Sequence, residues 1–258
     1  MDCKLSPQIE ELLKSLDDTE WQSSLYSLLQ NLTLAQVGVD MSVNQVEVDM
    51  FELMCKVLEK NLFAQADWAR KSCLFKELEV DNQMKLLQES WSEMMILDHI
   101  YHRMHNNLPD ETELPNGQKF KLLNLALFGI PEWAKSSSSS RMAEKFLQVS
   151  ENLKQLCFDS TDYVCLKLII SLNGGLVLRN LTNRQNLYER VQQAHQNLFE
   201  YCQTCCPNVP KKYDQLLAQL PELKLMAEQG EDFLYFQHMQ RNLPQATLLM
   251  EMLHAKKR

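Results

Sequence analysis

The chain has 258 residues, 45% of them hydrophobic, and a formal net charge of -8. That length and apolar content suit one large domain with a sizeable core and argue against disorder, while an acidic surface does not favour nucleic acid. No apolar run approaches the ~20 residues needed to span a bilayer, so we expect a soluble protein and no membrane partner.

Eight cysteines and few breakers characterise the composition, which has only 6 Gly and 8 Pro and favours helix over sheet. Most cysteines lie in apolar helical patterns, which indicates a reducing compartment rather than a disulfide framework. Cys202, Cys205 and Cys206 alone have a metal-like spacing, with His195 about two helical turns upstream. Zinc needs four ligands and no second Cys or His pair lies nearby in the sequence, so we predict no metal site.

Apolar periodicity predicts two helices at the start of the chain, over residues 5–16 and 19–34, followed by a loop over 35–45. A long helix is expected over 46–74. Another should cover 81–105, with Asp81 or Asn82 near its N-cap. Residues 91–100 are apolar on more than one face, as in a helix at the centre of a core.

Turn-forming residues over 109–120 predict a short hairpin, the only sheet we expect. A brief apolar helix follows over 122–128. The serine run at 136–140 is interpreted as a flexible loop. Further helices are predicted over the ranges 141–156, 160–172, 183–206 and 211–239.

The last apolar stretch is the one around which the chain is organised. Leu248, Leu249, Met252 and Leu253 share one helical face, and Glu251 sits at its edge. A helix of about two to three turns is unstable alone in water and must dock on something. It is either a structural lid or a docking switch.

Six positions of this stretch resemble the activation helix that ends nuclear-receptor ligand-binding domains: two apolars, any residue, Glu, two apolars. Residues 68–87 resemble that family's signature, with Trp68, Ala69 and Arg70 ending one helix and Gln83 opening the next. The family's Asp or Ser is Asn82 here. Residues 63–70, 83–88, 97–101, 162–167 and 248–256 resemble the fushi tarazu factor, steroidogenic factor and liver receptor homologue branch, especially its insect members.

The resemblance implies an all-α fold, a three-layer antiparallel sandwich of about ten to twelve helices with at most a small β-hairpin. Residues 46–258 would form the ligand-binding domain, with the activation helix at about 245–255, and residues 1–45 a hinge-side segment with the first helices. It implies transcription regulation in the nucleus and no enzyme. DNA binding in this family uses a separate upstream zinc module whose Cys pairs are missing here, so we expect a fragment or a receptor lacking that module.

The resemblance also implies a surface that binds coactivator helices of the form Leu-x-x-Leu-Leu (LxxLL). Such a helix has bare N–H groups at one end and bare C=O groups at the other, so an acid and a base can hold its two termini. Glu251 would be the acid and Arg70 the base, assisted by Gln88. The expected apolar floor consists of Leu74, Met84, Leu248 and Met252.

Ligand binding is left with two alternatives. Vertebrate members of the branch hold the phosphate of a phospholipid with a Tyr and a Lys, but the matching positions are Phe233 and Gln237, which offer neither a hydroxyl nor a charge. A phospholipid or another lipid could still bind, or residues 122–128 could fill the pocket, which we favour because it would keep the activation helix docked without ligand. No cofactor is expected. The other pocket candidates are Met54, Leu58, Met95 and His99.

Partners expected by resemblance are LxxLL-containing coactivators or a homeodomain protein, bound by a monomer. Residues 25–29 have the LxxLL form themselves; we interpret this as chance in a Leu-rich helix, with docking between chains as the alternative. His99 beside Asp98 is read as a core histidine rather than a catalytic one. The competing interpretation of the whole chain is an all-helical adaptor or scaffold whose last helix is a lid.

Overall fold

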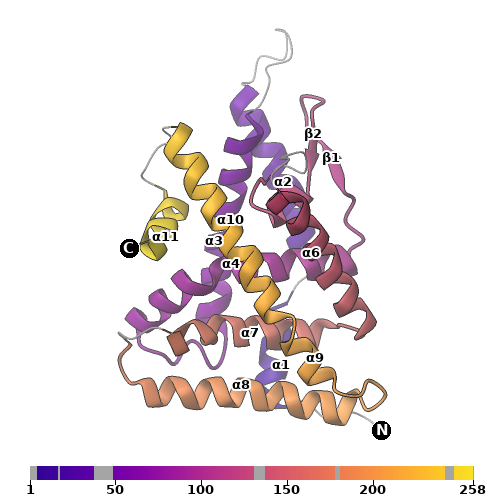
Figure 1. The fold of residues 1–258 in the computed structure, drawn as a ribbon, viewed down its shortest axis with the longest axis vertical. Helices are drawn as coiled ribbons and strands as arrows, with labels where there is room; N and C mark the ends of the chain where they lie inside the picture. The colour runs from indigo at the N-terminus through magenta and orange to yellow at the C-terminus, as the bar shows by residue number, and fades with distance from the viewer. Residues whose placement is uncertain are drawn as a thin grey trace.

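A computed structural model describes residues 5–16, 18–37, 49–130, 137–177, 181–241 and 247–257. Within these residues the fold is all-α apart from one small hairpin (Figure 1). The elements are α1 (Pro7–Lys14), α2 (Asp18–Val37), α3 (Met50–Lys71), α4 (Val80–His105), β1 (Glu111–Glu113), β2 (Lys119–Lys121), α5 (Leu123–Ala126), α6 (Ser137–Gln155), α7 (Ser160–Val177), α8 (Arg184–Cys205), α9 (Lys212–Leu217), α10 (Leu220–Arg241) and α11 (Leu248–Lys257).

The helices form the three-layer sandwich that the resemblance implied. Helix α4 lies at the centre and packs against α7, which in turn packs against α8. Helices α1 and α3 cover one side of this middle layer, and α6 and α10 cover the other. Figure 1 shows α11 at the edge, beside α3 and α10. The boundary expected near residue 45 lies outside the described residues.

Most predicted elements are present, with three corrections. The Asn82 side chain does not cap α4; it bonds the backbone of Thr182, and α4 begins after Glu79. Residues 137–140, expected in a loop, begin helix α6. The helix expected over 211–239 is two helices, because Pro221 cannot continue α9 and instead occupies the first turn of α10.

The hairpin confirms the turn prediction. Its strands pair antiparallel with Thr112 opposite Phe120, and Phe120 is buried while its neighbours Lys119 and Lys121 are exposed. Gly117 occupies the left-handed region (φ 80°) that the tight turn requires. Together they orient the chain into α5.

The core surrounds α4, whose residues 90–102 are almost all buried. One buried carboxylate there is fully paired: Asp98 accepts hydrogen bonds from Tyr163 and Lys167 of α7 and from Gln65 of α3. The Lys167 ammonium also lies 4.7 Å from the centre of the Trp68 ring. This network fixes the register of α3, α4 and α7 around one buried carboxylate.

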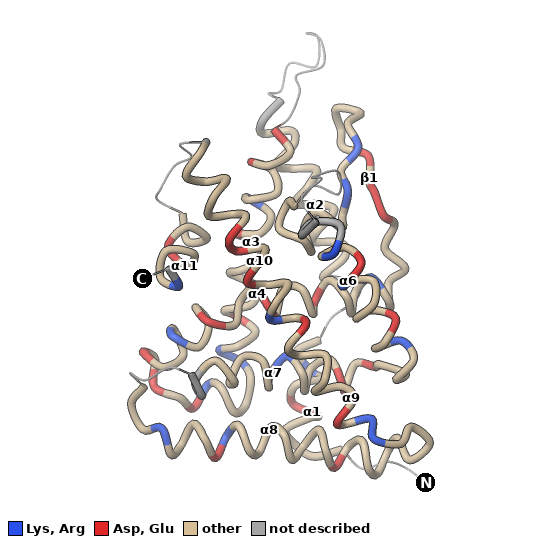
Figure 2. Tube along the Cα trace, viewed as in Figure 1, with Lys and Arg blue, Asp and Glu red and all other residues tan. Residues whose placement is uncertain are grey.

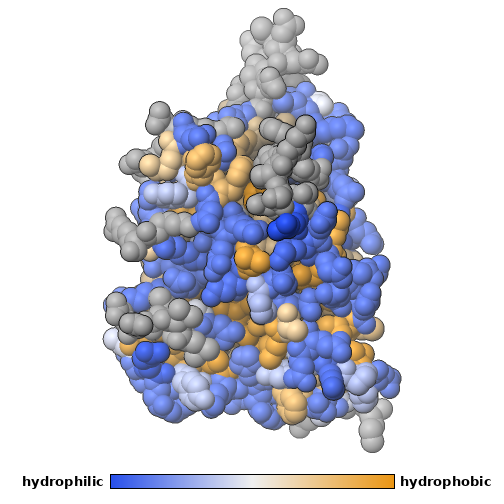
Figure 3. Space-filling model, viewed as in Figure 1, coloured by the Kyte–Doolittle hydropathy of each residue, from blue (hydrophilic) through white to orange (hydrophobic). Residues whose placement is uncertain are grey.

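Charged residues are distributed along the helices (Figure 2), and the face shown in Figure 3 is mostly hydrophilic with separate apolar patches. No helix in the described part of the chain combines the length and apolarity needed to cross a membrane.

Candidate functional site

Helix α11 is docked against α3, α4 and α10. Its apolar face is buried, comprising Leu249, Met250, Met252 and Leu253. Complete burial of one such side chain contributes about 1.5–3 kcal/mol, which is how a helix too short to form alone is held. A helix is therefore present where the activation helix was expected; it begins at Leu248, and residues 245 and 246 lie outside the described part.

Both ends of α11 are also held by polar contacts from other helices. The backbone N–H of Leu248 donates to Glu59 Oε1 on α3 (3.0 Å). At the other end Lys256 Nζ donates to Glu231 Oε1 on α10 (2.6 Å), and the Ser92 hydroxyl of α4 donates to the same oxygen. The sequence analysis missed Glu59 and Glu231, because no local pattern joins residues so far apart in the chain.

The two charges expected to hold a coactivator helix are both exposed. Arg70 lies in the last turn of α3 and Glu251 in the first turn of α11. Neither side chain forms an ion pair or hydrogen bond with another described residue. Glu59 of α3 contacts the first residue of α11. It lies eleven residues before Arg70, which corresponds to about 16 Å along the helix axis, the length of a short bound helix.

The expected apolar floor is only partly accessible. Met84 is 52% exposed and Leu248 is half-buried. Leu74 and Met252 are buried, with only 8% and 7% of their surface exposed. Gln88 is half-buried on the same side of α4 as Met84, one turn further along. Accessible apolar surface comes instead from two residues that the sequence analysis missed, Phe63 on α3 and Val80 on α4. Phe63 lies seven residues before Arg70 and so shares its helical face.

The interior between α3, α4 and α10 is filled by residues 122–129, the segment around α5, which we call the plug segment. Leu125, Ala126, Leu127 and Phe128 are buried, and Phe128 lies edge-on to Trp91 at a ring distance of 5.8 Å. A Cβ at Gly230 of α10 would overlap the Phe128 ring, and one at Gly129 would lie 2.7 Å from Met54 Sδ. Phe128 also adopts φ 52°, a conformation unusual for a bulky residue. Because Gly129 and Gly230 have no side chains, the plug segment can pack against Met54 and α10.

The expected pocket residues divide into two groups. Met54, Leu58, Met95 and His99 are buried, whereas Phe233 and Gln237 are half-buried on α10. His99 lines a cavity of about 10 Å³ together with Leu122, Leu123 and Ala126 of the plug segment. That volume accommodates about one water molecule. His99 is buried as expected, although its Nε2 has no partner, and burial lowers its pKa to about 4.

A charged cluster joins α4 to α10 and α11. Burial raises the pKa of Glu93 to about 7, and the nearby Glu231 and Glu228 add to the rise. Lys256 and Lys224 oppose it. Lys256 of the activation helix therefore lies in the field of several carboxylates, and its charge stabilises them.

The LxxLL-like residues of α2 are part of the core. Leu25 and Leu29 are 3% and 2% exposed. A coactivator leucine must be free to insert into a partner, so this segment is unavailable while α2 is packed. The burial of both leucines supports the interpretation of this motif as chance in a Leu-rich helix, and docking between chains stays untested.

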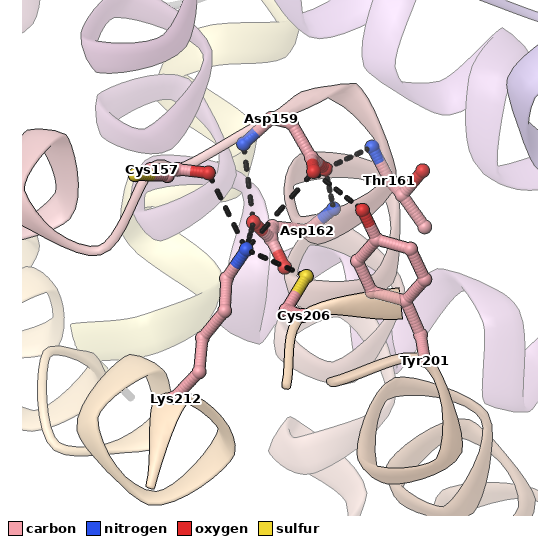
Figure 4. Close-up of polar contacts among 7 residues, drawn as sticks. All are labelled: Cys157, Asp159, Thr161, Asp162, Tyr201, Cys206 and Lys212. Carbon is pink, nitrogen blue, oxygen red and sulfur yellow. Dashed lines mark hydrogen bonds and ion pairs between the residues drawn. The ribbon is translucent and has the colours of Figure 1, made fainter. Parts of the chain in front are cut away.

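Beside the cysteine-rich end of α8, the buried Lys212 ammonium lies at the centre of a polar cluster (Figure 4). Lys212 Nζ lies 2.6 Å from Asp162 Oδ2 and 3.4 Å from Cys206 Sγ, and it donates to the Cys157 carbonyl (3.3 Å). His195 instead contacts the Tyr213 hydroxyl (3.0 Å). Among the described residues no group of three or more His, Cys, Asp or Glu is placed to hold a metal.

Comparison with known proteins agrees with this architecture. A family model described as the ligand-binding domain of nuclear hormone receptor matches residues 40–240. The nuclear hormone receptor FTZ-F1 of Drosophila melanogaster is 48% identical over 255 residues, 99% of this chain but 23% of that protein. Nuclear receptor subfamily 5 group A member 2 of Mus musculus is 37% identical over 214 residues, 83% of this chain and 37% of that protein. The chain thus spans well under half the length of these relatives.

A solved structure provides the matching fold. The crystal structure of the ligand-binding domain of fushi tarazu factor 1 of Drosophila melanogaster superposes with a TM-score of 0.86 at 47% identity, covering 98% of this chain and 96% of that one. These likenesses point to a receptor domain, not to an enzyme, and to the branch that the sequence resembles. The chain belongs to the family of nuclear hormone receptor ligand-binding domains.

Proposed function

We propose that this domain recruits LxxLL helices of transcriptional coactivators without first binding a ligand. The observation that carries the proposal is a pair of exposed and opposite charges, Arg70 and Glu251, on two helices that pack together and with no ion pair to another described residue. Exposed ion pairs contribute little, but charges aimed at the bare ends of a bound helix act on its dipole and on its unbonded backbone groups. Gln88 would assist Arg70 at the carbonyl end.

The apolar part of the recognition would come from Phe63, Met84, Val80 and Leu248. Leucines of an amphipathic helix bind by covering such exposed side chains, and the charges at either end set the orientation. Leu74 and Met252 would act mainly by supporting this surface from below, because both are buried.

Ligand independence is supported by the filled interior. A receptor that needs a ligand must leave space for it, whereas the plug segment buries Phe128 beside α10 and leaves about 10 Å³ next to His99. The proposed state has no phospholipid or other lipid and no cofactor. Phe233 and Gln237 carry no group that would pair with a lipid phosphate.

The wider role proposed is that of a transcription regulator acting in the nucleus, with DNA contacted through a separate zinc module. Coactivators bearing LxxLL are the proposed partners, and a homeodomain protein with the same motif is an alternative. A monomer suffices for this role. The division into a hinge-side segment up to residue 45 and the domain from 46 stays a prediction.

The test is a fluorescence-anisotropy titration of a labelled LxxLL peptide against the ligand-free domain. Micromolar binding is expected, and Glu251→Ala and Arg70→Ala should each weaken it at least about tenfold, equal to about 1.4 kcal/mol. Glu52→Ala, which removes a half-buried acid from the first turn of α3, is the control and should leave affinity unchanged. Equal affinity in all four proteins would reject the charge assignment, and no binding by any would favour the scaffold interpretation.

A further inference from the structure

The position of Glu251 depends entirely on where α11 docks, and α11 is a short terminal helix joined to α10 by a connection outside the described residues. Its buried apolar face supplies attraction, but apolar contact alone does not set the exact rotation or axial position of a helix. Polar contacts are directional, and they occur at both ends of α11 rather than along its middle. The two contacts use different partner helices.

The amino end is held by α3. Thr247 supplies the helix's own cap, since its hydroxyl accepts from Met250 N (3.3 Å) and its carbonyl accepts from Glu251 N (3.0 Å). That cap leaves the N–H of Leu248 open, and Glu59 fills it from outside at 3.0 Å. A carboxylate at this end also interacts favourably with the helix dipole.

The carboxyl end is held by α10. Glu231 is 3% exposed and accepts bonds from both Lys256 of α11 and Ser92 of α4. The Lys256 side chain is itself only 13% exposed in this pair. A buried carboxylate without a cation is strongly unfavourable, so the docked position of α11 depends on Lys256 remaining charged.

We propose that Glu59 and Glu231 are positioning residues of the coactivator surface, which hold α11 at its two ends and so fix where Glu251 is presented. The effect on peptide binding rests on the proposed function, because a released α11 carries Glu251 away from the proposed LxxLL-binding site. Lys256 would then control that surface. Loss of its positive charge would release α11, and no ligand would be needed for the release. The apparent affinity for an LxxLL peptide falls in proportion to the docked fraction.

The experiment compares hydrogen exchange of the α11 amides and LxxLL affinity in the same set of variants of the whole chain. Lys256→Gln and Glu59→Ala should each raise α11 exchange and weaken the peptide about tenfold, as expected if the docked fraction drops to about one tenth. Lys256→Arg should leave both α11 exchange and peptide affinity as in the parent protein, because it keeps the positive charge. In Lys256→Gln/Glu231→Gln the buried charge is gone, and most of the protection should return.

Asp214→Asn is the control, since Asp214 is an exposed carboxylate on α9, outside the charged cluster around Lys256. It should change neither readout, and exchange in α4 and α7 should stay slow in every variant, which separates release of α11 from unfolding. Unchanged α11 exchange in Lys256→Gln and Glu59→Ala would overturn the inference. If those variants do release α11 while the parent protein binds no peptide, the positioning role holds and the proposed coactivator function fails.

Discussion

Two regions that both contact α10 are built in different ways. Around Phe128 the contacts are apolar and interlocked, with an aromatic ring occupying the space left by Gly230. Around α11 the apolar contacts are supplemented by charged groups at both helix ends, Glu59 and the Glu231–Lys256 pair. The first arrangement cannot change without opening a cavity, whereas the second can be released by neutralising one charge.

The contacts around Phe128 keep the domain folded, whereas the contacts at the ends of α11 would keep it in the proposed peptide-binding state. Close-packed interiors tolerate no partial shift, so the plug acts as a fixed support. A terminal helix held by ionic contacts can undock while the core stays intact. Under the proposed positioning role, the domain would be regulated at α11 without any molecule entering its interior.

The largest expected effect comes from breaking the plug. Phe128→Ala should lower the free energy of unfolding by about 3–5 kcal/mol, because it removes a fully buried ring and leaves a cavity. Urea denaturation measures the loss. The cavity should be apolar and bind a small aromatic such as benzene, which would raise stability again. A change below about 1 kcal/mol would show that the ring is not a packed support.

A second prediction compares the ion pair at α11 with one buried in the core between α7 and α9. Lys212→Met leaves Asp162 buried without its cation, and it should cost about 3–5 kcal/mol of global stability. Lys256→Met removes a similar pair at α11 and should leave the main unfolding transition within about 1 kcal/mol of the parent. Denaturation of both variants, followed by circular dichroism, provides the comparison. Equal losses of global stability would mean that α11 is as integral to the core as α9.

The stability of the folded protein should depend on pH through Glu93, which lies in the charged cluster beside α10 and α11. Its pKa is raised from 4.5 to about 7 in the folded protein, mainly by burial. The unfolded chain loses this proton first, so the group's contribution to stability falls as pH rises from about 4.5 to about 7. Glu93→Gln should remove that decline and gain up to about 3 kcal/mol at pH 8 relative to the parent, with no difference at pH 4. Parallel stability curves for the two proteins would contradict the assignment.

The smallest expected effect concerns the accessible apolar surface alone. Phe63→Ala should reduce LxxLL affinity about fivefold, near 1 kcal/mol, because half of this ring is free to be covered by a bound peptide. Global stability should change little for the same reason. Exposed Leu147→Ala on α6, away from α3, is the control and should leave affinity unchanged. A peptide titration of both variants decides whether Phe63 belongs to the site.

Sequence patterns predicted the helices, the hairpin and the existence of α11, because apolar periodicity and turn residues are local signals. The resemblance supplied Arg70 and Glu251. Neither could reveal Glu59 or Glu231, whose roles exist only once α3, α10 and α11 are packed together. The error at 211–239 had a local cause that was overlooked, since Pro221 is a helix breaker. The caps were harder to read: Asn82 fits an N-cap by residue type but is used in a contact with Thr182.

The most direct test of the account uses protein whose native mass spectrum is recorded before an LxxLL titration. The account predicts the mass of the polypeptide alone together with micromolar peptide binding, because the interior is filled and α11 is already docked. A lipid bound at near-stoichiometric level would contradict the filled interior. Peptide binding that appears only after lipid is added would contradict the ligand-independent docking of α11.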